Sequence, residues 1–352
     1  MSGPGAHSPP QSAALTKSGI VGIEYALPER VVTNEELEEE HPGWNLPQVA
    51  KATGVFARHW CDSEETALDL AVAACERMMK RNPALISACD AILFCTQSPD
   101  HWMPPNACLL QDRLDLPPST AALDFSLACS GFVYGLYLAN ALVASGSAKQ
   151  VLLVTADTYS KWIHPNDRGP LTLFGDGAAI TVVAPSESGI GHCALGTDGT
   201  GGPLFCVPAG AARTPRSPET AQGKTDLFGN TRSAEHLMMN GPAVLDFVKQ
   251  EIPGFVRSFL ETVGESIDSL DLVVFHQASR LGLDYLNNAL NVPSEKRFSN
   301  IAAIGNTVSA SLPIALRQAE EDGTLVPGMR VLLVGFGVGL SWGATIITWG
   351  TS

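Results

Sequence analysis

The chain has 352 residues, of which 45% are hydrophobic, and its formal net charge at pH 7 is −14. This length allows a large hydrophobic core and about two domains. The acidic balance argues against nucleic acid and anionic membrane surfaces as partners. The sequence has no charge-free apolar run of about 18 residues, which argues against a transmembrane helix.

Eight cysteines are scattered along the chain, with no Cys-x-x-Cys pair and no spacing typical of metal ligands. In a chain of this size, the pattern indicates free thiols in a reducing compartment and not a disulfide framework. We therefore predict a cytoplasmic protein without a structural metal site.

The first 16 residues are rich in Gly, Ser, Pro and Ala and contain no apolar signal core. We predict that residues 1–16 form a disordered tail and not a signal peptide. The folded part is therefore expected to begin near residue 17.

Two pairs of apolar segments repeat at nearly the same interval. Residues 90–98 resemble residues 271–279, 181 positions later, and residues 151–154 match residues 331–334, 180 positions later. Each segment is apolar and rich in β-branched residues, which is typical of a strand buried on both faces. The shared interval indicates a duplicated α/β unit of roughly 180 residues.

The repeat divides the chain into two halves, residues 17–188 and 189–352. Helical patterns at residues 67–80 and 243–263 precede the first strand of each repeat, so mixed sheets flanked by helices are expected. Residues 196–230 are rich in Pro, Gly and Thr, and we predict a long surface loop or lid there.

Cys129 lies between an apolar stretch and a small-residue helical pattern, in the segment Leu-Ala-Cys-Ser-Gly-Phe. A cysteine that opens a helix is expected to be more acidic, because the positive end of the helix dipole favours the nucleophilic thiolate. The other seven cysteines lack this setting. Cys129 is therefore the candidate nucleophile.

Two further polar residues occupy related places in the second half. His276 follows the predicted buried strand 272–275, and Asn306 lies at roughly the position that Cys129 has in the first half. Residues 331–340 form a strand punctuated by glycines, which allow a ligand to approach backbone amides closely. Such amides can serve as an oxyanion hole.

Five short motifs occur in one order along the chain. They are residues 128–131 (Ala-Cys-Ser-Gly), 173–178 (Leu-Phe-Gly-Asp-Gly-Ala), 276–278 (His-Gln-Ala), 305–307 (Gly-Asn-Thr), and 335–337 with 341–343 (Gly-Phe-Gly and Ser-Trp-Gly). The set resembles the thiolase superfamily of condensing enzymes, and most closely its β-ketoacyl-acyl-carrier-protein synthase III branch. The resemblance runs from about residue 18 to residue 350. It implies an α/β, thiolase-like fold whose duplicated halves form a five-layer αβαβα sandwich.

The resemblance also implies roles for these residues. Cys129 would carry the acyl group as a thioester, and His276 and Asn306 would stabilise the enolate of a second thioester. The backbone amides of Cys129 and Val338 would form the oxyanion hole. Acyl-CoA or acyl-carrier-protein thioesters would be the substrates of a homodimer that holds no permanently bound cofactor and no metal.

Substrate contacts are expected from Arg168, Met103, Phe336 and Arg280. Met103 takes the place of an aromatic residue that relatives lend across the dimer to the acyl pocket, and Val338 replaces a glycine. Residues 48–54 lack the Trp and Arg of the motif that clamps the adenine of CoA in this family.

These departures favour a Claisen condensation in a specialised pathway, such as polyketide or other secondary-metabolite synthesis. Acyl transfer from Cys129 to an oxygen or nitrogen nucleophile is the first alternative. Fatty-acid initiation is the second. A non-catalytic subunit that shapes a partner's site is the third, and the intact Cys, His and Asn argue against it.

Overall fold

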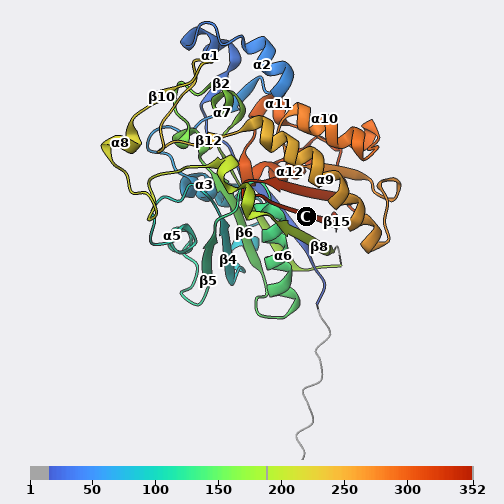
Figure 1. Ribbon diagram of the computed structural model, residues 1–352. Coiled ribbons are helices and arrows are strands. Elements are labelled where there is room, and N and C mark those ends of the chain that lie inside the picture. The colour runs from blue at the N-terminus through green and yellow to red at the C-terminus, as the bar shows by residue number, and fades with distance from the viewer. Residues whose placement is uncertain (1–15, 188, 351–352) are drawn as a thin grey trace, which may run out of the picture.

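The computed structural model describes residues 16–187 and 189–350. Two β-sheets lie in its interior, and helices cover their outer faces and fill the space between them (Figure 1). The predicted tail, residues 1–16, falls outside the described residues except for Thr16.

The first sheet contains five strands. In spatial order these are β1 (Ser18–Ala26), β7 (Gly177–Pro185), β6 (Val151–Asp157), β4 (Ala91–Cys95) and β5 (Ala121–Phe125). Strand β4 runs parallel to β5 and β6, whereas β7 runs antiparallel to β6 and β1. All residues of β4 and β6 are buried, as their continuous apolar sequences predict.

The second sheet repeats this arrangement with four strands. In spatial order these are β13 (Leu272–Phe275), β14 (Arg330–Gly337), β15 (Ser341–Thr348) and β8 (Ile190–Thr197). Parallel β13 and β14 correspond to β4 and β6, and Leu272 pairs with Val331 as Ala91 pairs with Val151. The strands predicted from the repeat are confirmed. Among the described strands, β5 has no counterpart in the second sheet.

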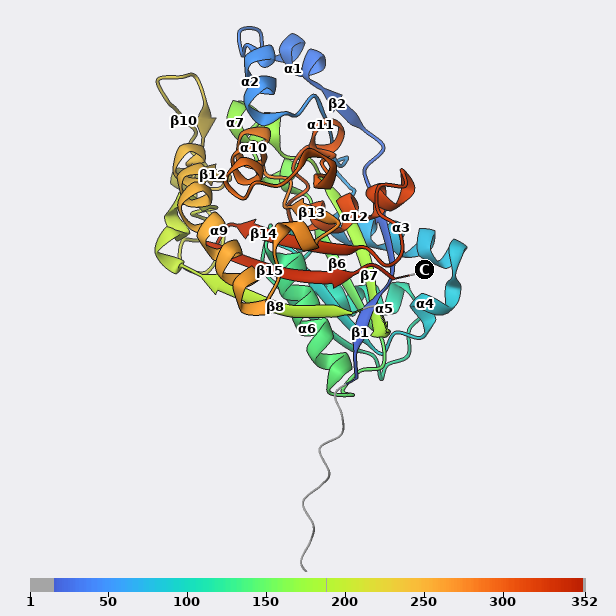
Figure 2. The same ribbon diagram turned by 90° about the vertical axis from the view of Figure 1, so that its right-hand side faces the viewer.

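Helices form three layers around the two sheets (Figures 1 and 2). Helices α3 (Ala67–Arg81) and α5 (Asn106–Arg113) pack on the outer face of the first sheet, and α9 (Gly241–Val263) packs on the outer face of the second. Helices α6 (Gly131–Ala144) and α12 (Ser311–Glu321) lie between the sheets. The five-layer αβαβα arrangement is therefore as predicted.

The middle layer explains the composition of its helices. Helix α6 has the sequence GFVYGLYLANALVA, with no charged residue, because it faces both sheets. The outer helix α3 instead begins with a capping box between Thr66 and Asp69 and ends with Lys80 and Arg81. A buried helix and a surface helix are thus distinguished by sequence alone.

The upper end of the molecule carries two small helices, α1 (Asn34–Glu40) and α2 (Leu46–Thr53), and the strand pair β2 (Val31–Thr33) and β3 (Ala57–His59). Helix α10 (Arg280–Ala289) packs against α2 and α9. The remaining α-helices are α4 (Pro83–Ser87), α7 (Arg168–Leu173), α8 (Pro218–Ala221) and α11 (Ile301–Ile304). The 3-10 helices are η1 (Tyr159–Trp162), η2 (Gly199–Leu204), η3 (Ile267–Ser269), η4 (Ser294–Lys296) and η5 (Val308–Ala310).

The predicted long loop is mostly irregular but begins two residues later than expected, because β8 continues to Thr197. It contains η2, α8 and the short strands β9 (Phe205–Cys206) and β10 (Lys224–Thr225), and β11 (Thr231–Arg232), which pairs with β10, follows it directly. Strand β9 pairs with β12 (Met238–Met239). This pairing brings the early part of the loop next to the segment that follows its end. In the part of the chain that the structure describes, no helix combines the length and apolar character needed to cross a membrane.

Candidate active site

Cys129, His276 and Asn306 line one cavity of about 180 Å³. Its walls also include the aromatic rings of Phe174 and Phe336. Residues that are as much as 177 positions apart in the sequence are therefore brought together, as the repeat and the motifs predict.

The middle layer brings two of these residues together. Cys129 lies two residues before α6, and Asn306 lies just before η5 and α12. His276 follows β13, whose neighbour β14 passes beside the start of α6. Equivalent positions in the two halves thus converge at one end of the two central helices.

Strand β14 passes unusually close to Cys129. A Cβ atom added at Gly337 would lie 2.8 Å from the Cβ and 3.0 Å from the Sγ of Cys129. A Cβ atom added at Gly335 would lie 2.8 Å from the Cys129 carbonyl oxygen. Any larger residue at these two positions would force the cysteine or β14 to shift, so the close approach favours glycine.

Burial raises the pKa of the Cys129 thiol, and the negative charge of Asp157 raises it further, whereas the cysteine's own backbone N–H lowers it. The increase in acidity that was expected from the helix start is therefore outweighed by desolvation. Cys129 rests as a neutral thiol and must lose its proton during attack.

His276 is buried, and burial lowers the pKa of its imidazole to about 3. The ring is neutral at physiological pH. Its Nδ1 lies 2.6 Å from the Oγ of Ser311, the first residue of α12. When Nδ1 accepts a hydrogen bond from the Ser311 hydroxyl, Nε2 carries the ring hydrogen and is available as a donor.

The amide of Asn306 is held in one orientation. Its Oδ1 accepts a hydrogen bond from the Val308 backbone at 2.9 Å, and its Nδ2 lies 3.4 Å from the Ala278 carbonyl oxygen. Its backbone bonds to Leu173 and Gly175 at 2.9 and 3.0 Å. The Nδ2 group is thereby left as the donor on the cavity side.

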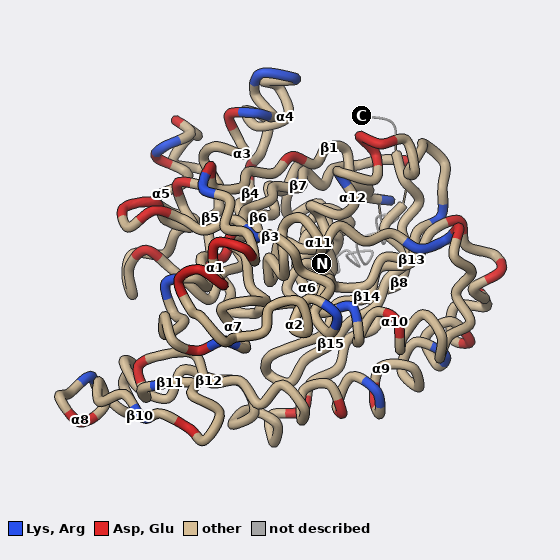
Figure 3. Tube along the Cα trace, turned by 90° about the horizontal axis from the view of Figure 1, so that it is seen from above, with Lys and Arg blue, Asp and Glu red and all other residues tan. Residues whose placement is uncertain are grey.

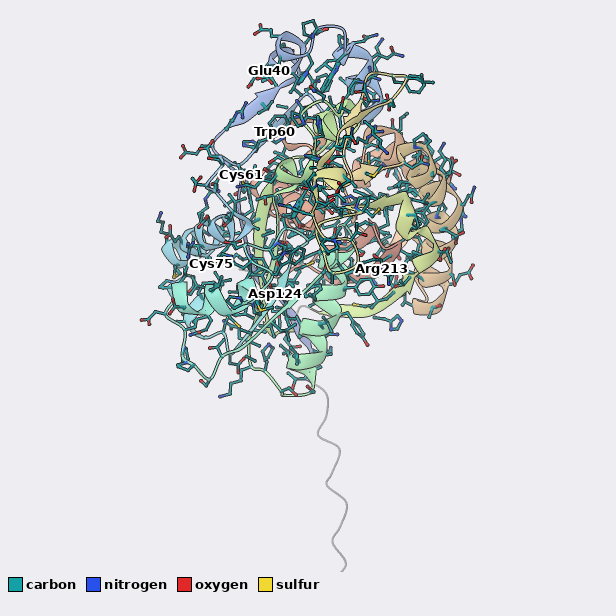
Figure 4. The ribbon with its side chains drawn as sticks, turned by 60° about the vertical axis from the view of Figure 1, so that its left-hand side comes forward. Glu40, Trp60, Cys61, Cys75, Asp124 and Arg213 are labelled. Atoms are coloured by element: carbon teal, nitrogen blue, oxygen red, sulfur yellow. The ribbon has the colours of Figure 1, made fainter. Side chains whose placement is uncertain are left out.

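The motif at residues 173–178 supports this loop and does not itself contribute a reacting group. The Asp176 carboxylate accepts hydrogen bonds from the backbone and hydroxyl of Ser160 and from the backbone of Cys61. Trp60 donates to the Phe174 carbonyl at 3.2 Å. Figure 4 shows Trp60 and Cys61 on the segment that descends from the α1 end toward α3. Burial raises the pKa of Asp176 to about 6.

The predicted substrate-contacting residues lie in different places. Phe336 lines the cavity, and its ring meets the edge of His276 at a centroid distance of 5.6 Å. Arg280 hydrogen-bonds the Lys51 carbonyl oxygen, and Figure 3 shows basic residues where α2 and α10 meet. Met103 is 81% exposed and does not line this cavity.

The last of the predicted contacts, Arg168, lies beside an aromatic pair that sequence reasoning missed. Its guanidinium donates to the Trp44 carbonyl at 3.3 Å, and the Trp44 ring stacks on His41 with the ring centroids 3.9 Å apart. Trp44 lies four positions before Gln48 and precedes α2, so the family's Trp position in this sequence holds only the glutamine.

A second cavity, of about 290 Å³, was also missed. Gln97, Tyr159, Trp162 and Val338 are among its lining residues. Gln97, Tyr159 and Trp162 belong to no motif and no local pattern marks them, whereas Val338 is the residue that replaces a glycine of the family. Their proximity is created by the packing of η1 and the long loop against the end of β4.

Within the described ranges, no group of three or more His, Cys, Asp or Glu side chains is arranged to hold a metal ion. The Val338 amide, which follows Gly337, donates no hydrogen bond to another described residue. It is therefore free to bind a substrate oxygen.

Two family models match the chain. The model described as 3-oxoacyl-[acyl-carrier-protein (ACP)] synthase III matches residues 123–199, and the model for the C-terminal part of the same synthase matches residues 260–349. The first match contains Cys129, and the second contains His276 and Asn306.

Curated relatives match almost the whole chain. The beta-ketoacyl-[acyl-carrier-protein] synthase III 3 of Streptomyces coelicolor is 37% identical over 343 residues, which cover 95% of this chain and 98% of the relative. The beta-ketoacyl-[acyl-carrier-protein] synthase III of Rhodopirellula baltica is 34% identical over 350 residues, with coverage of 94% and 98%.

Solved structures give the same result. A crystal structure of a 3-oxoacyl-(acyl-carrier-protein) synthase III superposes with a TM-score of 0.92 at 42% identity and covers 95% of this chain and 100% of that one. The priming β-ketosynthase of the R1128 polyketide pathway superposes with a TM-score of 0.82 at 26% identity, with 99% of each chain covered. The thiolase-like fold predicted from the motifs is confirmed.

Proposed function

Because the chain belongs to the 3-oxoacyl-[acyl-carrier-protein] synthase III family, we propose that Cys129, His276 and Asn306 carry out its Claisen condensation. The chain is an acyltransferase of this type and acts on acyl thioesters of CoA or acyl carrier protein. The observation that carries the residue assignment is that a buried thiol and two neutral donors share one 180 Å³ cavity.

The first step loads the enzyme. The Cys129 sulfur attacks the thioester carbonyl carbon, a new C–S bond forms, and the bond to the carrier sulfur breaks. The proton of the Cys129 thiol leaves with the carrier thiol, so charge is conserved. The amides of Cys129 and Val338 donate to the carbonyl oxygen as it becomes negative.

The second step forms the carbon–carbon bond. The second thioester becomes an enolate when its carboxylate leaves as carbon dioxide and the electron pair of the broken C–C bond passes to the enolate, whose oxygen accepts hydrogen bonds from His276 Nε2 and Asn306 Nδ2. The enolate carbon attacks the acyl carbonyl, and the bond to Cys129 breaks. The released thiolate then takes up a proton. A neutral His276 suits this role, because it donates a hydrogen bond without placing a buried charge beside an apolar substrate.

The pathway is proposed separately from the reaction. Val338, Met103 and Gln48 depart from the family motifs, and the similarity to a polyketide priming synthase agrees with a specialised pathway. The names of the curated relatives fit fatty-acid initiation at least as well. The acyl group that loads Cys129 distinguishes the two pathways.

We also propose a homodimer that forms around β5, the edge strand of the first sheet. Leu123 on β5 is 45% exposed, and Trp102 and Met103 expose large apolar side chains. Unpaired edge strands and exposed apolar groups commonly mark an interface. The cytoplasmic location remains a prediction from the free cysteines.

Mass spectrometry of the intact protein tests the nucleophile. Incubation with acetyl-CoA, longer acyl-CoAs or acyl-carrier-protein donors should add one acyl group to the wild-type chain. The adduct should disappear in Cys129→Ala and persist in Cys108→Ala, which removes an exposed thiol. An adduct that survives in Cys129→Ala would contradict the assignment.

A further inference from the structure

The second cavity adjoins the active site and has a different lining. Phe205 lines both cavities, and Val338 of the second follows Gly337 of the first. The cavity at Cys129 extends to Thr53 on α2 and to the exposed Leu281 on α10, so it opens toward the surface there. A thioester whose carrier enters from that side would direct the far end of its acyl chain toward the second cavity.

Three aromatic rings form the partition between the cavities. The centroid of the Tyr159 ring lies 5.2 Å from that of Phe174 and 6.4 Å from that of Phe205, and Phe174 and Phe205 are 6.0 Å apart. Tyr159 is buried in the same core cluster as Cys129. Burial raises the pKa of Tyr159, and the negative charge of Asp157 raises it further.

The second cavity holds a fixed amide. The hydroxyl of Tyr159 donates to the Oε1 of Gln97 at 2.5 Å, and the Gln97 backbone N–H donates to Asp157 Oδ1 at 2.8 Å. The first contact orients the Gln97 side-chain amide, and the second fixes the Gln97 backbone. Because its oxygen is occupied, the Nε2 group remains as the donor.

Two side-chain donors in this cavity have no acceptor among the residues that the structure describes. Across the described residues, neither Gln97 Nε2 nor Trp162 Nε1 donates a hydrogen bond to another group. The rest of the wall is mostly apolar and includes Phe205, Val207 and Leu237, with Ser126 as a further polar residue. A half-buried donor in an apolar wall is costly unless a ligand or water satisfies it.

On the basis of the proposed function, we propose that the second cavity selects short acyl groups that carry an oxygen acceptor. A hydroxyl, keto or ether oxygen on the chain would accept a hydrogen bond from Gln97 Nε2, and Tyr159 would hold that amide in place. An acyl chain without an oxygen substituent would leave Gln97 Nε2 without a hydrogen-bond acceptor. Gln97 is therefore a specificity-determining residue, and Tyr159 is a positioning residue.

The test compares two acyl groups of equal length in the full chain. Butyryl-CoA and 3-hydroxybutyryl-CoA, with 4-hydroxybutyryl-CoA as a second oxygen position, are each incubated with the protein. The rate of adduct formation at Cys129 is followed by mass spectrometry. In the wild type, at least one oxygenated group should load faster than butyryl. The ratio of the two rates cancels any general loss of active protein.

Variants of the cavity should change this ratio. Gln97→Leu should lower it by about five- to tenfold, the effect of one hydrogen bond. Tyr159→Phe should lower it by a smaller factor, because the amide remains but is no longer held. Gln150→Leu is the matched control. It removes a half-buried amide that bonds the Leu85 carbonyl, far from the site, and should leave the ratio unchanged.

The outcomes separate the two proposals. Faster loading of butyryl by the wild type, or an unchanged ratio in both Gln97→Leu and Tyr159→Phe, would overturn the selectivity while leaving Cys129 as the nucleophile. Failure of every acyl donor to modify Cys129 would overturn the proposed function and this inference with it.

Discussion

The two halves of the molecule share a scaffold but use it differently. Cys95 ends β4 in the first half at the place where His276 follows β13 in the second. The Cys95 thiol donates to the Leu127 carbonyl at 3.0 Å and fills space beside Gly131, whereas His276 faces the cavity. The same topological position is core in one half and active site in the other.

The helix starts differ in a complementary way. The first half places a nucleophile before α6, and the second places an amide donor before α12. Burial raises the pKa of Cys129 and lowers that of His276, so both groups are uncharged at rest. In the proposed mechanism, acyl loading uses Cys129 of the first half with the Val338 amide of the second, whereas enolate stabilisation uses His276 and Asn306 of the second half alone.

Asn306→Ala gives the sharpest separation of these two tasks. Removal of one fixed donor to a developing oxyanion typically lowers the rate by about 100- to 1000-fold. Condensation, measured as product formation, should fall by this factor, while acylation of Cys129 should continue. Asn140→Ala, on α6 beside Ser18, serves as the control and should affect neither step. Equal loss of both steps in Asn306→Ala would show that the halves do not divide the reaction.

Gly337→Ala tests the contact between the halves. The new Cβ would lie 3.0 Å from Cys129 Sγ, so the cysteine or β14 must shift. Small misplacements of a reacting group are costly, and we expect acylation to slow by about 10- to 100-fold. Gly254→Ala is the control, because a Cβ there meets nothing within 4 Å. Wild-type acylation by Gly337→Ala would contradict the close approach.

The pH dependence of stability tests the neutral state of His276. Its pKa is lowered to about 3 in the folded protein from an ordinary value of 6.5. Its contribution to stability is therefore fully present above about pH 6.5 and is lost as the pH falls toward 3. Relative to His276→Gln, the wild type should lose at most about 1.4 kcal/mol per pH unit in this window.

Denaturant unfolding at several pH values between 4.5 and 7.5 measures this difference. The exposed His101 provides a control variant, His101→Gln, which removes an imidazole from the surface. A difference between wild type and His276→Gln that stays constant over the whole range would show that the imidazole is not held neutral by burial.

Sequence reasoning could predict what the repeat and the motifs encode. The interval between residues 151 and 331 predicts paired strands in two sheets, because each strand is apolar on both faces. The order of the motifs predicts that Cys129, His276 and Asn306 meet. The repeat interval and the motif order are both read directly from the sequence. Neither requires knowledge of how side chains pack.

The missed features depend on packing between distant segments. Gln97 and Tyr159 are 62 positions apart and belong to no motif, so only the folded chain shows their hydrogen bond. The acidity of Cys129 was misjudged for a related reason. The helix start is visible in the sequence, but the desolvation that outweighs it comes from residues packed around the thiol.

Cys95→Ala tests whether the strand-end position of the first half is core, and it has the smallest expected effect of these variants. If the strand-end position of the first half is core, removal of its thiol should lower the free energy of unfolding by about 1 kcal/mol and leave acylation and condensation within about twofold of wild type. Cys108→Ala, at an exposed position, should change stability by no more than about 0.5 kcal/mol. A large loss of condensation in Cys95→Ala, with stability unchanged, would mean that this position takes part in the reaction. Cys95 and His276 would then both face the substrate, and the two halves would differ only in the chemistry of these residues.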